Sequence, residues 1–290
     1  MNRVYSMVTG VALGGLALFA AVGVSSGSAT SAATGASTGG TMIPTPRSQP
    51  TPLVAGHSST GNIEESANWS GYAQNNGTKK GPFTGAEATF AVPTVSEPHT
   101  GTQYSSEWVG IGGYNEDTLV QDGVEADNHD GTPAYQAWTE ILPASSVPLK
   151  LTIHPGDKIQ ATVRETALNT WIMTVADLTA GTQASRTVNY DSNGASAEMI
   201  LERPEVGGSL ANLAKTSKVV FKPGGVTTTA PGSTAVYTPF LVPVTGQTVY
   251  EIAMTNNNGA KVIAIPSAPD AKLNGFTVRD GSVAPNPPKG

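Results

Sequence analysis

Carboxylate, amide and tryptophan side chains alternate with apolar residues along four segments of this chain. In an extended strand, alternate residues share one face, so each segment places its polar groups on the face opposite its apolar ones. If the four strands are neighbours, the polar face collects two Trp, two Gln and five carboxylates: Trp108, Gln121, Glu125, Asp127, Gln136, Trp138, Glu140, Glu198 and Glu202. Apolar walls raise the pKa of unpaired carboxyls, and such a face is typical of a ligand groove.

Each of these residues also has a plainer interpretation. Exposed Asp and Glu are the ordinary surface residues of an acidic protein. Trp108 and Trp138 are equally consistent with core packing or with stacking on sugar rings. Their position beside carboxylates that lack nearby Lys or Arg favours a groove, without deciding what the groove binds.

Most other catalytic groups are missing from the sequence. The chain has no cysteine, which excludes disulfides, thiol nucleophiles and zinc–thiolate sites. Its four histidines are not at metal-ligand spacing, and a G-x-S-x-G pattern at residues 23–27 lies in the N-terminal apolar region, where it is a chance match. No tandem Asp-Thr-Gly or Asp-Ser-Gly motif indicates a two-lobed aspartic peptidase. The remaining chemistry is that of carboxylates, amides and water, and we expect neither a metal nor a cofactor.

Length and charge divide the chain into four parts. The 290 residues carry a net charge of −6, which argues against nucleic acid as a partner. Residues 1–29 have the basic start, apolar centre and small residues of a secretory signal peptide, so we expect a secreted, extracellular protein without a membrane anchor. Residues 30–63 are rich in Ser, Thr, Gly, Ala and Pro and predict a pro-segment or linker. The folded domain is expected at 64–284, as a monomer, followed by a Pro-rich tail at 285–290.

Short strands account for almost all of this domain. Gly, Pro, Asn and Asp separate segments of alternating polarity, and only residues 205–215 have a pattern that suits a short helix. The predicted strands are Glu87–Val92, Ser105–Ile111, Thr118–Asp127, Ala134–Leu142, Leu149–His154, Lys158–Thr166, Thr170–Thr179, Ser185–Tyr190, Ser196–Glu202, Lys218–Lys222, Val249–Met254, Lys261–Ile265 and Phe276–Arg279. The pattern predicts an all-β fold, an antiparallel sandwich or barrel.

Six segments, in order, resemble the glutamic peptidases, also called eqolisins. They are NWSGY (68–72), EATFAVP (87–93), WVGIG (108–112), LVQDGV (119–124), YQAWTEILP (135–143) and SAEMILERP (196–204). The resemblance implies an antiparallel two-sheet β-sandwich of the concanavalin A-like (lectin-like) type with a concave substrate groove. It also implies a catalytic dyad of Glu198 and Gln121, groove tryptophans at Trp108 and Trp138, and a further acidic position at Glu140.

The resemblance further implies an acid endopeptidase that acts on protein or peptide substrates without a covalent intermediate. The carboxylate of Glu198 would take a proton from the attacking water, and Gln121 would stabilise the oxyanion. Gln136 and Glu125 lie on the same predicted face and are expected to contact substrate. Gly112 and Gln136 stand where the better-known fungal pattern has Asp, and these departures bear on subsite preference and pH optimum.

Two other functions fit the same residues. A glycoside hydrolase on this sandwich would use Glu198 with Glu202, or Glu125 with Glu140, as acid and base. A non-catalytic lectin-like module would stack sugars on the tryptophans and use the carboxylates for hydroxyls or calcium. Release of peptides at low pH would distinguish a peptidase from both.

Overall fold

The computed structural model describes residues 62–289, except 79 and 97–99. The signal peptide expected at 1–29 and nearly all of the pro-segment expected at 30–63 lie outside these residues. Over the described ranges the chain is all-β, and no helix there is long and apolar enough to cross a membrane.

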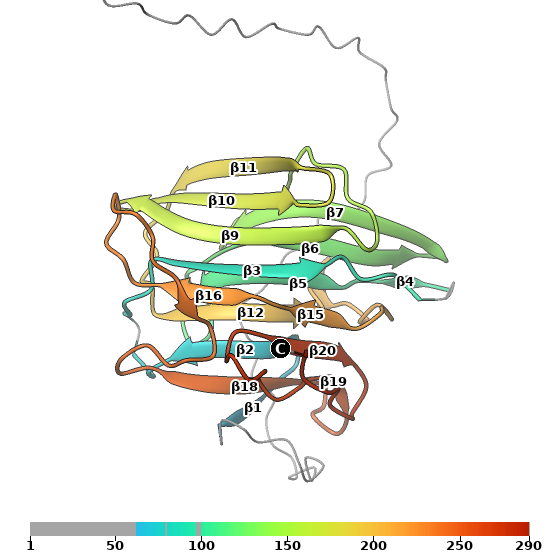
Figure 1. The fold of residues 1–290 in the computed structure, drawn as a ribbon. Coiled ribbons are helices and arrows are strands. Elements are labelled where there is room, and N and C mark those ends of the chain that lie inside the picture. The colour runs from blue at the N-terminus through green and yellow to red at the C-terminus, as the bar shows by residue number, and fades with distance from the viewer. Residues whose placement is uncertain (1–61, 79, 97–99, 290) are drawn as a thin grey trace, which may run out of the picture. The chain divides into compact units, whose positions relative to one another are not determined.

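Two large sheets carry the fold (Figure 1). The twelve-stranded sheet has the order β15-β20-β19-β18-β2-β12-β5-β6-β7-β8, with β1 paired to β18 and β4 to β6. Its strands are β1 (Ile63–Ser66), β2 (Trp69–Asn75), β4 (Thr102–Gln103), β5 (Ser106–Gly112), β6 (Leu119–His129), β7 (Thr132–Ile141), β8 (Val147–Pro148), β12 (Ser196–Glu202), β15 (Val219–Phe221), β18 (Thr248–Thr255), β19 (Val262–Pro266) and β20 (Phe276–Asp280). All its pairings are antiparallel except β1 with β18.

The six-stranded sheet has the order β11-β10-β9-β3-β16-β17. Its strands are β3 (Gly85–Ala91), β9 (Lys158–Ala167), β10 (Thr170–Asp177), β11 (Thr182–Asn189), β16 (Gly224–Thr227) and β17 (Thr238–Pro239). All of its pairings are antiparallel. The prediction of an antiparallel two-sheet sandwich is therefore confirmed.

The main hydrophobic core lies between the two sheets. Val124 of β6 and Met199 of β12 belong to it, together with Val163 of β9 and Met173 of β10, and all four are fully buried. Side chains alternate along a strand. On the twelve-stranded sheet, residues that alternate with core positions such as Val124 and Met199 therefore project from its opposite face. We call that opposite face, which carries Gln121, the site face.

Two predicted elements are wrong, and both errors have a local cause. Residues 149–154 form no strand; Val147–Pro148 pairs with β7, and the Leu149 amide adds one bond to the Ala137 oxygen. Pro148 and Pro155 flank that segment and cannot donate to a strand ladder. Residues 205–215 contain no helix: β13 (Glu205–Val206) and β14 (Ser209–Leu210) form a hairpin, and its turn uses Gly207 and Gly208 at φ 61° and 79°.

Candidate active site

One transverse row of the site face brings three of the predicted residues together. Glu198 of β12 lies opposite Gly110 of β5, Gly110 lies opposite Gln121 of β6, and Gln121 lies opposite Glu140 of β7. Glu198 and Gln121 are two strands apart, about 10 Å between Cα atoms. Gly110 puts no side chain between them, and a Cβ there would lie 2.8 Å from Cζ3 of Trp108 and 3.3 Å from Cβ of Gln121.

Gln121 is fully buried and makes one hydrogen bond along this row. Its Nε2 donates to Oε2 of Glu140 over 2.6 Å, whereas its Oε1 has no partner among the described residues. Burial raises the pKa of Glu140 to about 9, and the charge of Glu202 adds to this, against the opposing effect of the hydrogen bond from Gln121. Glu140 is therefore protonated throughout the acid range.

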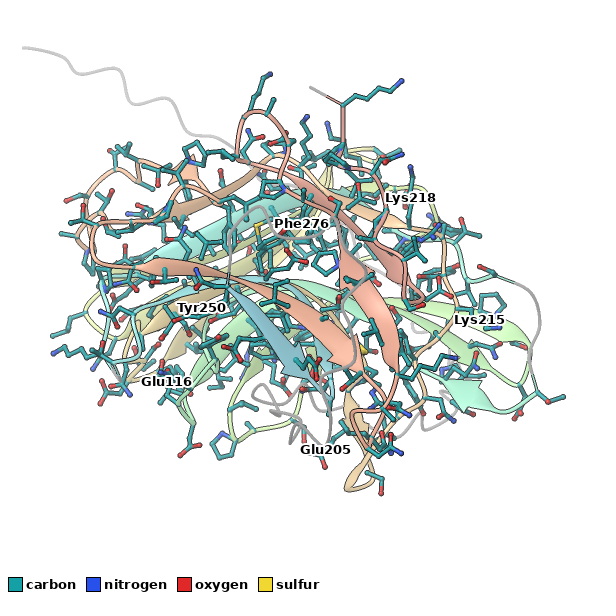
Figure 2. The ribbon with its side chains drawn as sticks, turned by 90° about the horizontal axis from the view of Figure 1, so that it is seen from below. Glu116, Glu205, Lys215, Lys218, Tyr250 and Phe276 are labelled. Atoms are coloured by element: carbon teal, nitrogen blue, oxygen red, sulfur yellow. The ribbon has the colours of Figure 1, made fainter. Side chains whose placement is uncertain are left out.

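Glu198 is also fully buried. Burial raises the pKa of this carboxyl well above its ordinary value, a contact with the Ser196 hydroxyl lowers it in part, and the nearby charge of Glu116 raises it further. Tyr114 and Tyr250 flank the same position, with ring centroids 5.2 Å apart. Figure 2 shows Tyr250 and Glu116 toward the same end of the molecule.

The next row along the site face holds the two predicted tryptophans. Trp108 lies opposite Gly123, and Gly123 lies opposite Trp138. Both indoles are buried, with 0% and 2% exposure, and Trp108 also packs edge-on against Trp69 with ring centroids 5.0 Å apart. The Nε1 of Trp108 donates to Oε2 of Glu202 over 2.9 Å, whereas the Nε1 of Trp138 has no partner among the described residues.

The comparison with known families decides the identity of this arrangement. The sequence profile of the Peptidase A4 family, the glutamic peptidases or eqolisins, matches residues 67–269. The chain belongs to this family. It is therefore a glutamic endopeptidase, a hydrolase of peptide bonds, as the six resembling segments implied.

Solved glutamic peptidases share its fold. A crystal structure of scytalido-glutamic peptidase with a transition state analog inhibitor has a TM-score of 0.58 and 24% identity, covering 74% of this chain and 98% of that one. Aspergilloglutamic peptidase from Aspergillus niger has a TM-score of 0.50 and 29% identity, covering 61% of this chain and 99% of that one. Among curated proteins, no sequence matches the chain.

Two other predicted residues of this glutamic peptidase lie farther along the site face. Glu125 lies opposite Gln136, four residues along β6 from Gln121, about 13 Å away. The Nε2 of Gln136 donates to the backbone oxygens of Ala137 and Leu149, each over 3.0 Å. Gln136 thus anchors the segment that follows β8 by hydrogen bonding to Leu149. Both Gln136 and Glu125 lie away from the row that holds Glu198 and Gln121.

The carboxylate pairs suggested for a glycoside hydrolase are spread in the same way. Glu198 and Glu202 are four residues apart on β12, and Glu125 lies four residues from the partner of Glu140, so each pair spans about 13 Å of backbone. Glu202 is moreover held by Trp108 and by Nδ2 of Asn68, at 3.1 Å. The family match therefore disfavours the glycosidase alternative.

Glu116 and Tyr114 also lie near Glu198, although neither was predicted from the sequence. Both belong to the connection between β5 and β6, where side chains no longer alternate, so strand periodicity gave no signal for them. Gly112, at the start of this connection, has φ +96°, and a Cβ there would lie 2.2 Å from the backbone oxygen of Thr118. The Asp of the fungal pattern would not fit at this position.

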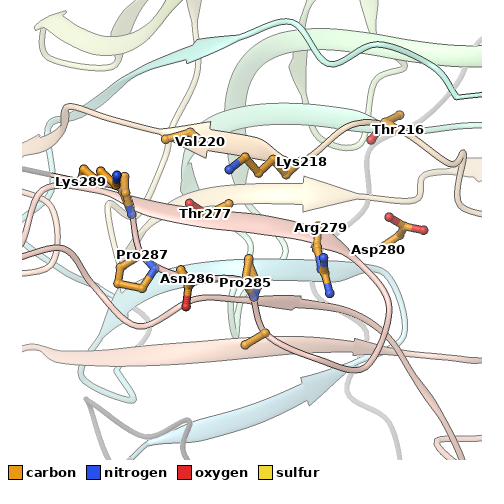
Figure 3. A pocket seen from close by; sticks show the side chains of 12 residues that line it. Thr216, Lys218, Val220, Thr277, Arg279, Asp280, Pro285, Asn286, Pro287 and Lys289 are labelled. Carbon is orange, nitrogen blue, oxygen red and sulfur yellow. The ribbon is translucent and has the colours of Figure 1, made fainter.

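The described cavities lie elsewhere. One of about 870 Å³ is bounded by β15, β20 and the C-terminal residues Pro285–Lys289 (Figure 3). Two others, of about 410 and 390 Å³, are also lined by residues outside the predicted site. In the part of the chain that the structure describes, no group of three or more His, Asp or Glu side chains is arranged to hold a metal ion.

Proposed function

We propose that this glutamic peptidase cleaves peptide bonds with Glu198, Gln121 and an activated water, without a covalent intermediate. The observation that carries the proposal is the row in which Glu198 and Gln121 flank the side-chain-free position of Gly110. A base and an amide donor in one row, with no side chain from the strand between them, suit the attack of water on a carbonyl bound between the two.

Glu198 serves first as a base and then as an acid. Its carboxylate takes a proton from water while the water oxygen bonds to the scissile carbonyl carbon. The carbon–nitrogen bond of the tetrahedral intermediate then breaks, and the same proton passes from Glu198 to the departing amine. The enzyme ends in its starting state, and no bond forms between protein and substrate.

Gln121 stabilises the oxyanion, and Glu140 orients it for that task. Because Glu140 is protonated at acid pH, its hydroxyl is able to donate to Oε1 of Gln121 once the amide turns over. Nε2 then points away from Glu140 and is available to the developing oxyanion. Glu140 acts in this scheme as a positioning residue for the dyad glutamine.

The remaining predicted residues provide the substrate surface. Trp108 and Trp138 form an apolar wall one row from the dyad, and the unpartnered Nε1 of Trp138 is a donor for a substrate carbonyl. Glu125 and Gln136 lie two rows away, where a longer peptide would reach. We expect the substrates to be proteins and peptides, and the enzyme to be secreted and monomeric. We expect the pH optimum to be acidic once water reaches Glu198 in the processed enzyme, because burial is the main cause of its raised pKa.

Digestion of casein at several values between about pH 2 and pH 7, the range in which carboxyls titrate, tests the proposal. The substitution Gln121→Ala removes the oxyanion donor and is expected to lower kcat by about 10²- to 10³-fold. Gln183→Ala, an exposed glutamine on β11, is the matched control and should leave kcat unchanged. Full activity of Gln121→Ala would contradict the proposed role.

We further propose that residues 30–63 are a propeptide whose removal activates the enzyme. Glu198 and Gln121 have no exposed surface, whereas a peptidase must admit substrate to its catalytic groups. We expect the secreted precursor to be inactive, and acid treatment to yield activity together with a new N-terminus near Glu64. N-terminal sequencing at several pH values measures this, and an active precursor that keeps residues 30–63 would contradict it.

A further inference from the structure

Glu116 occupies a space that a glycine leaves beside the catalytic row. The connection from β5 to β6 turns at Gly112, and a Cβ at Gly112 would lie only 3.1 Å from Oε1 of Glu116. Any side chain at position 112 would therefore displace this carboxylate. Gly112 is two residues after Gly110, the side-chain-free position between the two dyad residues.

The carboxylate of Glu116 is buried, and its oxygens accept no hydrogen bond from the described residues. Glu116 is only 7% exposed, and neither of its oxygens has a hydrogen-bond partner among the described residues. Its connection is fastened at both ends: the side chains of Asn115 and Asn75 bond to each other over 3.3 Å, and the Leu119 amide donates to the Tyr190 hydroxyl over 2.9 Å. A buried carboxylate held this way acts on its surroundings mainly through its charge.

The charge of Glu116 acts on the pKa of the catalytic residue Glu198. The titratable groups around Glu198 are Tyr114 and Glu116 of the β5–β6 connection, Tyr250 of β18, Glu140 of β7 and Glu202 of its own strand. Burial raises the pKa of Tyr114 and of Glu140, so both side chains are neutral in the acid range. Of these groups, Glu116 is the carboxylate whose charge raises the pKa of Glu198.

We propose that Glu116 is a positioning residue of this peptidase: lodged beside Glu198 in the space left by Gly112, it controls the protonation of the catalytic glutamate. The inference rests on the proposed role of Glu198 as the base. With Glu116 ionised, Glu198 holds its proton to higher pH, because two like charges in a buried site repel each other. The carboxylate form needed for water activation then becomes abundant only at higher pH.

The pH dependence of kcat/KM tests this proposal. Glu116→Gln keeps the shape of the side chain and removes its charge, so the acid limb of kcat/KM should move down by about one pH unit. Below the wild-type midpoint the variant should then be several-fold more active than wild type. Asp117→Asn is the matched control: it removes a charge from the neighbouring exposed residue, and its limb should coincide with that of wild type.

A second readout separates this inference from the proposed function. In enzyme labelled with ¹³C at glutamate carboxyls, the Glu198 signal is assigned by its loss in Glu198→Gln, and its titration should move down in Glu116→Gln. A moved titration with an unmoved kinetic limb would support the role of Glu116 but refute Glu198 as the base. If neither moves, the proposal is overturned.

A structural role for Glu116 makes a different prediction. It would lower activity equally at every pH, in Glu116→Gln and Glu116→Asp alike, and that outcome also overturns the proposal. Glu116→Asp keeps the charge but withdraws it by one methylene, so its limb should lie between those of wild type and Glu116→Gln. If Glu116→Gln does not fold, the acid limb of kcat/KM in Glu116→Asp tests the proposal instead. An acid limb at the wild-type pH would then contradict it.

Discussion

Replacing Glu198 with Gln is expected to lower kcat on casein by about 10⁴-fold or more, an effect of the size seen when a residue that forms or breaks bonds is removed. The amide of Gln is not basic enough to take a proton from water, and it has no acidic proton to give to the leaving amine. Substrate binding should change little, because the new side chain has nearly the same shape, so KM is expected to stay close to wild type.

Glu87→Gln is the matched control for this substitution. Glu87 is a half-buried glutamate on β3 of the other sheet, and burial raises the pKa of its carboxyl too, yet it lies outside the catalytic row. Its variant should keep full activity on casein between about pH 2 and pH 7. Thermal unfolding of both variants confirms that they fold. A folded Glu198→Gln enzyme with wild-type kcat would remove Glu198 from the mechanism, whatever the family.

The strands that carry the dyad were predictable because their two faces differ. On β12, Ala197, Met199 and Leu201 point into the core, and Glu198 projects from the opposite face, so alternation gave both the bounds Ser196–Glu202 and the correct face. The same reasoning assigned Gln121 on β6. Periodicity places a residue on a face, whereas its neighbour across the sheet depends on strand order and register, which no single segment encodes.

Strand β2 shows where this reasoning fails. It lies beside β12 and is buried along its whole length, yet no strand was predicted here, and only its first four residues were recognised, as part of the family motif NWSGY (68–72). Tertiary contacts allow the polar side chain of Gln74 to be buried there: its amide donates to the backbone oxygen of Val242 and accepts from the Val244 amide. Polar groups satisfied by distant segments leave no alternating pattern in the sequence.

Glu116 illustrates a second limit. Its place beside Glu198 depends on the path of a connection and on the space at Gly112, and neither follows from strand periodicity. Burial of the site residues was equally hidden, since a face with five carboxylates suggests an exposed groove. The structure instead gives Glu198, Gln121 and Glu140 no exposed surface.

Replacing Glu107 with Gln should stabilise the fold near neutral pH and leave it almost unchanged in acid. Glu107 projects from β5, is fully buried, and accepts a hydrogen bond at Oε1 from the Ser105 hydroxyl over 2.7 Å. Burial raises the pKa of this carboxyl from 4.5 to about 8, partly opposed by that hydrogen bond. Gln keeps the acceptor for Ser105 and has no proton to lose.

The sign of the effect follows from proton linkage. Between about pH 4.5 and pH 8 the folded chain keeps the Glu107 proton that the unfolded chain has released. The free energy of unfolding therefore falls as pH rises through this window, by about 1.4 kcal/mol per pH unit for one group. Below pH 4.5 both states bind the proton and the effect vanishes. Glu251, whose pKa burial raises to about 7, contributes with the same sign.

Urea unfolding at pH 4 and pH 7 measures the difference. We expect Glu107→Gln to match wild type at pH 4 and to exceed it by several kcal/mol at pH 7. Asp191→Asn, at an exposed position, should follow wild type at both values. If the free energy of unfolding changes equally between pH 4 and pH 7 in wild type and in Glu107→Gln, then Glu107 does not limit stability. If they diverge as expected, ionisation of Glu107 helps to set the upper pH limit of the folded enzyme, while Glu198 and Glu116 set the lower limit of its activity.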